Sequence, residues 1–130
     1  MKTLRKYALV LLLFIYPCIL HPSTFHSEDE ETVTVHVYRP KRLVGFAWVF
    51  QLKRDGEKCG RIKNGGHLVF KLKPGKVTFS VKKKEVELYL EKGKTYYLRS
   101  FIAAGVYIGS LDLIEVTEPF ALKELSEKGD

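Results

Sequence analysis

The residues that could bind a metal ion are few and widely spaced in this sequence. Two of the four histidines, His21 and His26, lie near the N-terminus, which leaves His36, His67 and Cys59 in the rest of the chain. A structural metal site needs three or four converging His, Cys, Asp or Glu side chains, and these residues lack the paired spacing typical of such sites. We therefore expect no metal and no cofactor.

Catalytic groups are equally sparse. The candidate nucleophiles lie in alternating runs typical of strands rather than on a nucleophile turn, and they are Ser80, Ser100 and Ser110. The carboxylates that could pair for glycoside cleavage are Asp55, Glu57, Glu87 and Asp112, of which the first two fit turn and surface positions. Asp112 has apolar neighbours on both sides, and a hydrolytic site would need it in a deep pocket with His36 or His67. We expect no enzyme, with a small hydrolase as the remote alternative.

Exposed basic residues are better candidates for function. Eight of them occur at the ends of expected strands, where loops could gather them on one rim: Arg39, Lys41, Arg42, Lys53, Arg54, Lys82, Lys83 and Lys84. With Tyr38, Tyr96 and Tyr97, such a rim suits sulfate, phosphate, an acidic sugar or a protein partner. The alternative is that these lysines and arginines only solvate strand ends and block edge pairing.

The charge of the chain is unevenly distributed. Residues 32–116 contain 17 Lys and Arg against 7 Asp and Glu, a net charge of +10, whereas the whole chain has a formal net charge of +7. Acidic residues are concentrated on both sides of this basic body. A basic body attracts anionic surfaces through a long-range, salt-sensitive term that carries no specificity.

The N-terminus has the pattern of an export signal. Lys2, Arg5 and Lys6 precede Tyr7–Leu20, a run of 14 uncharged residues interrupted only by Pro17. This run is typical of a secretory signal and short for a bilayer-spanning helix, which needs about 20 apolar residues. We expect an exported protein of the periplasm or cell envelope, and export disfavours nucleic acid as a partner although the charge would suit it.

Three fates of this segment stay open. Cleavage after Cys18, Ser23 or Ser27 would place a large side chain at the −3 position, where small residues are preferred. Lipid attachment at Cys18 would follow Pro17, which is unusual for a lipoprotein signal, and the third possibility is a retained short anchor. Residues 1–20 are thus a signal peptide or membrane anchor, and residues 21–31 have the composition of an acidic linker.

Short apolar-alternating segments separated by turn signals fill residues 32–116. Asp55-Gly56 predicts a two-residue type I′ hairpin, and Pro74-Gly75 predicts another turn. One long strand is expected over Phe46–Arg54, with Phe46 and Trp48 among its core residues, and the last strand over about Val106–Val116. After it, Thr117 could cap a short C-terminal helix within residues 117–130, and its expected apolar stripe is Phe120, Leu122 and Leu125.

These elements define an all-β fold. Strands spaced at 8–12 residues without crossover helices predict antiparallel pairing, and about seven to nine of them must form two packed sheets or a barrel. We predict an antiparallel β-sandwich over residues 32–116, with a small barrel as the alternative.

Five turn-rich segments carry a resemblance to a known family. They are Val37–Pro40, Asp55–Gly60, Ile62–Gly65, Leu72–Lys76 and Glu91–Arg99. As an ordered set they resemble an exported bacterial family known as domain of unknown function 2846, whose members are often lipoproteins, and more weakly the PEGA-type modules of surface proteins. The resemblance implies an immunoglobulin-like or prealbumin-like sandwich in the cell envelope, a core thiol at Cys59, and no activity.

The expected function follows from the signal-like N-terminus and the absence of a catalytic set. We expect a non-enzymatic envelope protein that acts as a structural or interaction module, associated with the membrane through its N-terminus and with an envelope protein or an anionic envelope polymer. The alternative is a binding module for an anionic ligand such as an acidic glycan or a phosphorylated lipid.

Overall fold

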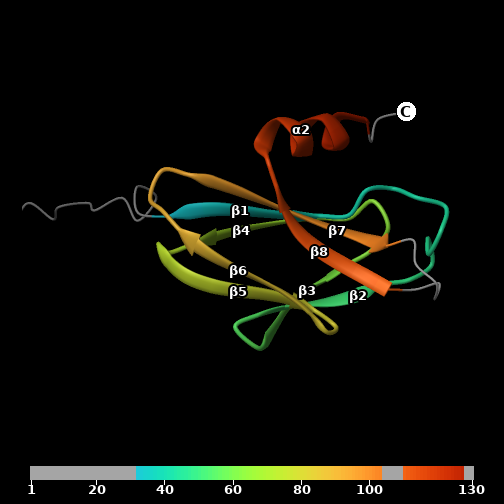
Figure 1. Cartoon of the computed structure of the whole chain (residues 1–130), viewed down its shortest axis with the longest axis horizontal. Coiled ribbons are helices and arrows are strands. Elements are labelled where there is room, and N and C mark those ends of the chain that lie inside the picture. Colours follow the sequence, from blue (N-terminus) through green and yellow to red (C-terminus); the bar gives the residue numbers. More distant parts are fainter. Residues whose placement is uncertain (1–31, 104–109, 128–130) are drawn as a thin grey trace, which may run out of the picture.

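The computed structural model describes residues 32–103 and 110–127, which fold into a two-layer β-sandwich with one helix (Figure 1). The strands in these residues are β1 (Val33–Tyr38), β2 (Phe50–Arg54), β3 (Glu57–Ile62), β4 (His67–Leu72), β5 (Gly75–Val81), β6 (Lys84–Leu90), β7 (Thr95–Ala103) and β8 (Ser110–Val116), and the helix is α2 (Glu118–Ser126). The predicted sandwich is therefore confirmed, as is a short C-terminal helix. The export signal, Cys18 and the acidic linker lie outside the described residues.

The strands form two four-stranded sheets. One has the order β4-β1-β7-β8 and the other the order β3-β2-β5-β6. Every neighbouring pair is antiparallel except β1 and β7, which are parallel. This pair departs from the antiparallel pairing that the sequence predicts, because β1 and β7 are distant in sequence and the five strands β2 to β6 lie between them along the chain.

Alternating apolar residues build the core between the sheets. The most deeply buried side chains include Val35, Leu52, Phe79 and Leu98, which are all fully inaccessible to solvent. Cys59 is partly buried against this core, and it is the extra residue where the register of β2 and β3 shifts between Leu52 and Lys53. Burial raises the pKa of its thiol above the usual range, which agrees with a packed rather than a reactive thiol.

Two hairpin turns require backbone conformations that most residues avoid. Asp55 and Gly56 both have positive φ, 50° and 82°, as the predicted type I′ turn demands. Lys82, in the turn between β5 and β6, has φ 52° although it is not a glycine, at a cost of about 1 kcal/mol. Sequence patterns identify the first turn and give no sign of the second.

Two predicted elements differ in extent from the structure. The strand expected over Phe46–Arg54 begins only at Phe50, and residues 39–49 form a loop, so the placement of Phe46 and Trp48 in the core is wrong. The loop is stabilised by bonds from Phe46 N to Leu43 O and from Trp48 N to Gly45 O, at 3.3 and 3.0 Å. The expected last strand is present from Ser110, and its earlier part lies outside the described residues.

Helix α2 lies on the outer face of the β4-β1-β7-β8 sheet (Figure 1). Its Ala121 is buried with Tyr38 and Tyr97 in a second apolar cluster. Phe120 and Leu122 are 47% and 50% exposed, so the stripe predicted for this helix is wrong except for the partly buried Leu125. Thr117 occupies the N-cap position without a side-chain hydrogen bond. None of the helices in the described ranges is long and apolar enough to cross a bilayer.

Candidate functional surface at the β1–β2 loop

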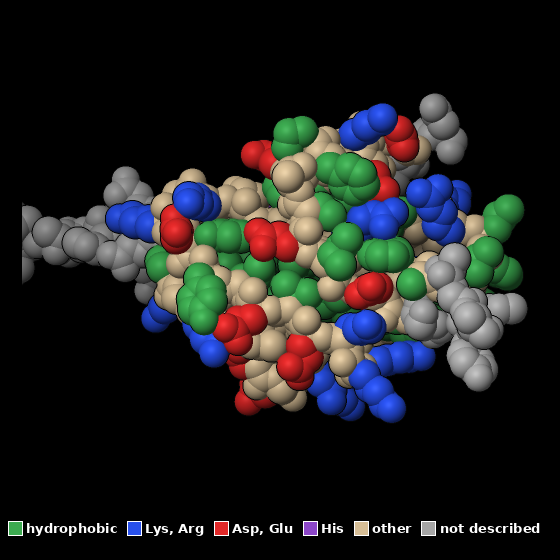
Figure 2. Space-filling view, in the orientation of Figure 1, with side chains coloured by type: hydrophobic (Ala, Val, Ile, Leu, Met, Phe, Trp, Pro, Cys, Tyr) green, Lys and Arg blue, Asp and Glu red, His purple; other side chains and the backbone are tan. Residues whose placement is uncertain are grey.

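The connection between β1 and β2, residues 39–49, exposes an unusual concentration of apolar side chains. Leu43 is 90% exposed, and the other large apolar residues left in solvent here are Val44, Phe46, Trp48 and Val49. We call residues 39–49 the β1–β2 loop. In Figure 2 apolar side chains stand out at the end of the molecule where Figure 1 places this loop. Contiguous exposed apolar groups mark interaction sites more often than isolated ones do.

A buried arginine holds this loop in place. Arg39 is only 2% exposed, and its guanidinium donates hydrogen bonds to the carbonyl oxygens of Trp48 and Gly45, at 2.6 and 2.7 Å. The same group lies 5.0 Å from the centre of the Phe50 ring. Burial lowers the pKa of Arg39, but a guanidinium still keeps its charge at neutral pH. The loop is thus built around a permanent positive charge.

Gly45 and Asn64 fix the shape of the loop further. Gly45 has φ 70°, and a Cβ added there would overlap Cδ1 of Ile102. Asn64, from the turn between β3 and β4, accepts a bond from Arg42 N and donates one to Arg42 O, both at 2.9 Å. The apolar side chains are therefore displayed by a defined backbone and not by a featureless connection.

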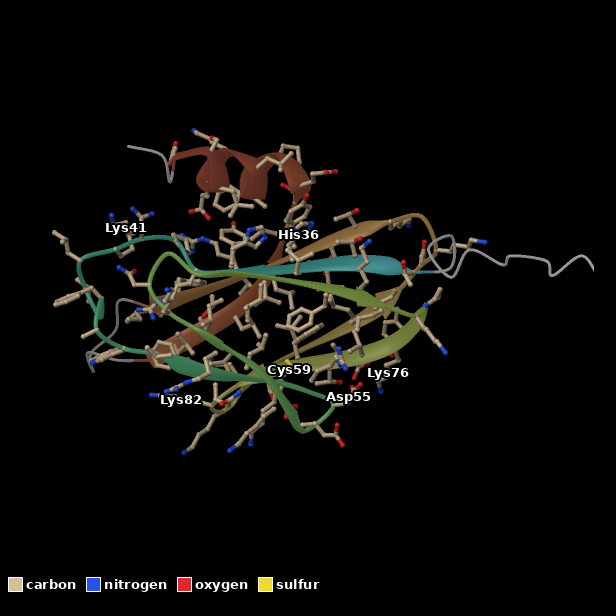
Figure 3. All side chains as sticks on the ribbon, turned by 180° about the vertical axis from the view of Figure 1, so that it is seen from behind. His36, Lys41, Asp55, Cys59, Lys76 and Lys82 are labelled. Carbon is tan, nitrogen blue, oxygen red and sulfur yellow. The ribbon has the colours of Figure 1, made fainter. Side chains whose placement is uncertain are left out.

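Cations surround the loop. Lys41 and Arg42 precede its apolar part, Lys63 lies in the adjoining turn, and Lys82 places its ammonium 5.0 Å from the Phe50 ring centre. Figure 3 shows Lys41 and Lys82 at the same end of the sandwich, away from Asp55 and Lys76. The described loops at this end, residues 39–49, 63–66 and 82–83, contain no Asp or Glu. The charged residues of these loops are therefore all basic, and Glu124 on α2 is a carboxylate that interacts with one of them, Arg42.

The predicted basic rim is therefore only partly assembled. Lys41, Arg42, Lys82 and Lys83 occupy the loop end, and the ammonium of Lys82 lies over the Phe50 ring. Arg39 does not belong to an exposed rim, because its side chain is buried and its guanidinium is hydrogen-bonded to carbonyl oxygens of its own loop. The other three are strand residues: Lys84 begins β6, Lys53 pairs with Ser80, and Arg54 lies 6.0 Å from the Phe70 ring centre.

The histidines and Asp112 do not form one site. His36 Nδ1 and His67 Nε2 are 2.9 Å apart. The ring of Tyr97 stacks on that of His36, at 4.6 Å between ring centres. Burial lowers the pKa of His36, against an opposing effect of Glu118. Asp112 lies on β8, where it accepts a bond from Leu113 N. It is two strands and four residue positions away from His36, a separation of roughly 16 Å at ordinary strand spacings. A candidate metal cluster is not found in the described ranges.

A second surface feature is an open acidic cleft of about 790 Å³ between β6 and β8. Its lining includes Glu87, Glu91, Glu115 and Glu118. Three of these carboxylates already have partners: Glu87 pairs with Lys76 at 3.1 Å, Glu91 pairs with Lys94, and Glu118 accepts a bond from Tyr97. Two of the four cleft carboxylates are therefore paired with lysines, whereas the loop end presents exposed apolar groups beside basic residues.

Sequence reasoning missed the apolar residues of the loop. Within the apolar segment Leu43–Val49, the alternation of large residues from Phe46 onward predicts a strand for Phe46–Val49. The signal that could have separated loop from strand is Gly45, which follows two adjacent aliphatic residues and interrupts the alternation.

The described residues form a small β-sandwich with an exposed apolar loop between β1 and β2. A family model described as "Protein of unknown function (DUF2846)" matches residues 29–111, more than half of the chain, so the chain belongs to that family. Among solved structures it is similar to the N-terminal domain of AlgF from P. aeruginosa, with 16% identity and a TM-score of 0.43 over 67% of this chain and 95% of that one. A search of curated proteins found no match.

Proposed function

We propose that this protein is a non-enzymatic, exported cell-envelope protein that acts as an interaction module, and that the β1–β2 loop is its binding element. The observation that supports this most is that the exposed apolar side chains lie on a loop with a defined, hydrogen-bonded backbone. Five large apolar residues lie in solvent on a loop whose backbone is held by the buried Arg39.

The energetics of the loop favour a binding role. Exposed apolar groups gain roughly 25 cal/mol for each Å² removed from water, so a partner that covers Leu43, Val44 and Phe46 gains stability that the free protein lacks. The defined loop shape reduces the conformational entropy that is lost on binding. A merely solvated connection would need neither feature.

A second candidate is a binding module for an anionic envelope ligand, an acidic glycan or a phosphorylated lipid. It is favoured by the basic composition of the loops at this end, which carry Lys41, Arg42, Lys82 and Lys83 and contain no carboxylate among their described residues. The two candidates share one surface and differ in whether apolar contact or charge provides most of the affinity.

In-cell photo-crosslinking tests the binding element. A benzophenone amino acid replaces Phe46 in the full chain, and the matched control carries it at Phe120, which is 47% exposed on α2. Crosslinks to envelope components at position 46, and none above background at position 120, are the expected result. Equal yields at the two positions would remove the loop from the proposal.

Export is tested separately. Intact mass and N-terminal sequencing of the protein from its native host distinguish cleavage, lipid attachment at Cys18 and a retained N-terminus. Recovery of the uncleaved, unmodified chain from the cytoplasmic fraction would contradict the envelope location.

A further inference from the structure

The arrangement of apolar side chains on the β1–β2 loop suits contact with a lipid bilayer. Leu43, Val44 and Phe46 are 90%, 63% and 69% exposed. Hydrophobic side chains stand out at the loop end of the sandwich in Figure 2. Trp48 is nearer the base of the loop, with its ring in an edge contact to Phe50 at 6.4 Å between centres. Aliphatic groups at the tip and an amphipathic tryptophan behind them match the depth profile of a bilayer surface.

The charges around the loop distinguish a bilayer from a protein partner. Lys41, Lys63, Lys82 and Lys83 are all exposed, and the loops that carry them contain no carboxylate. Lysine is depleted in protein–protein interfaces, where its flexible chain and strong hydration are unfavourable. Near an anionic lipid surface, in contrast, each Lys or Arg contributes favourably without a fixed geometry.

The internal charge adds to this preference. Arg39 lies beneath the loop, and no ion pair with a carboxylate is found for it in the parts of the chain that the structure describes. Its charge is shared only with two carbonyl dipoles and an aromatic ring. An anionic surface that covers the loop would complete the electrostatic balance.

We infer that the β1–β2 loop docks on a bilayer containing anionic phospholipid, with Leu43, Val44 and Phe46 entering the interface and the surrounding lysines contacting phosphate groups. This inference rests on the proposed function and names the partner of the same loop. It specifies a contact that is separate from any attachment through the N-terminus.

The sequence provides a direct probe, because Trp48 is the only tryptophan in the chain. Purified full-length protein is mixed with vesicles of phosphatidylcholine, or of phosphatidylcholine and phosphatidylglycerol, whose acyl chains carry bromine atoms that quench tryptophan. Quenching reports how deeply Trp48 enters the bilayer of the vesicle. Residues 1–20 cannot contribute to the fluorescence signal, because they contain no tryptophan. We expect quenching and a blue-shifted emission with phosphatidylglycerol, weakened by salt.

Two sets of variants separate the apolar and charged contributions. For the double variant Lys82→Glu and Lys83→Glu, the ratio of quenched to unquenched Trp48 should fall at least about fivefold for each cation. Leu43→Ser should reduce it about tenfold. The matched controls, Lys92→Glu and Leu122→Ser, change an exposed lysine in another turn and an exposed leucine on α2, and they should leave the ratio unchanged. Circular dichroism confirms that each variant is folded.

Three outcomes decide the inference. Quenching that requires phosphatidylglycerol and both parts of the loop supports it. Quenching of equal strength in pure phosphatidylcholine, insensitive to salt and to the lysine variants, overturns the role of anionic lipid. An unquenched Trp48 in every vesicle overturns docking on a bilayer. In that last case, protein adducts from the Phe46 crosslinker would still uphold the proposed function, whereas their absence as well would end both.

Discussion

Two arginines, the buried Arg39 and the partly buried Arg99, support neighbouring parts of this molecule in different ways. Arg99 lies under helix α2, where its guanidinium donates two bonds to Glu124, at 2.8 and 2.9 Å, and Tyr38 donates a third to the same carboxylate at 2.7 Å. Arg39 lies under the β1–β2 loop and donates only to carbonyl oxygens. The first charge is neutralised inside the fold, while the second is not.

The surfaces above them differ in the same sense. The outer face over β1 and β7 is covered, because α2 buries Ala121 against Tyr38 and Tyr97. The apolar residues of the β1–β2 loop have no such cover among the described residues. The apolar surface over β1 and β7 is therefore covered within the fold. The apolar surface of the β1–β2 loop is exposed and has the composition of an interaction site.

Removing Glu124 should have the strongest effect on stability. Side-chain exposures of 15% and 13% for Arg99 and Glu124 make the pair partly desolvated, so Glu124→Ala would leave a partly buried cation without its carboxylate. We expect a loss of about 3 kcal/mol in the free energy of unfolding, measured by urea denaturation. Glu127→Ala, at an exposed position just after α2, is the control and should change little. A loss as small as that of the control would show that α2 is held by apolar contact alone.

Removing the guanidinium of Arg39 should loosen the loop with a smaller effect on the fold. In Arg39→Met the carbonyls of Gly45 and Trp48 lose their donor, and we expect a loss of about 2 kcal/mol. Amide hydrogen exchange should speed up in residues 41–49 and stay slow in β7. Arg54→Met, which also removes a guanidinium near a phenylalanine ring, serves as the control. Unchanged exchange in the loop would contradict its support by Arg39.

Acidification should weaken the covered face more than the loop. Burial lowers the pKa of His36 in the folded state, so below its unfolded value of 6.5 the unfolded chain binds more protons and stability falls. The loss should begin as the pH drops through about 6.5 and should be smaller in His36→Gln. Thermal unfolding between about pH 8 and about pH 5.5 measures this loss of stability. Glu124 titrates below this range, because the hydrogen bonds from Arg99 and Tyr38 outweigh the effect of burial and lower the pKa of Glu124. Equal pH dependence in the variant would exclude His36 as the cause.

Polar substitution at the loop tip should cost the least stability. Leu43 is almost fully exposed, so Leu43→Ser should change the free energy of unfolding by about 0.5 kcal/mol or less. The same change at Leu52, which is fully buried, should be strongly destabilising. A large loss for Leu43→Ser would mean that the loop is part of the core and not a free surface.

The sequence predicts the sandwich well and its functional surface poorly. Local signals are sufficient for the hairpin at Asp55-Gly56 and for the alternation of Val33, Val35 and Val37, because turn chemistry and burial act on neighbouring residues. The burial of Arg39 depends on carbonyls of Gly45 and Trp48 and on the ring of Phe50, none of which is its neighbour in sequence. The same is true of Glu124, whose partners come from β1 and β7. Charges were visible in the sequence, but whether each is paired depends on tertiary contacts.

The most direct test of the central claim is the accessibility of Trp48 in the full chain, measured by acrylamide quenching before and after isolated envelope membranes are added. We predict a tryptophan that the quencher reaches readily in the free protein and much less readily once membranes are present, with this protection lost in Leu43→Ser and kept in Leu122→Ser. A tryptophan that remains equally accessible with and without membranes would contradict the claim that the β1–β2 loop is the binding element of this protein.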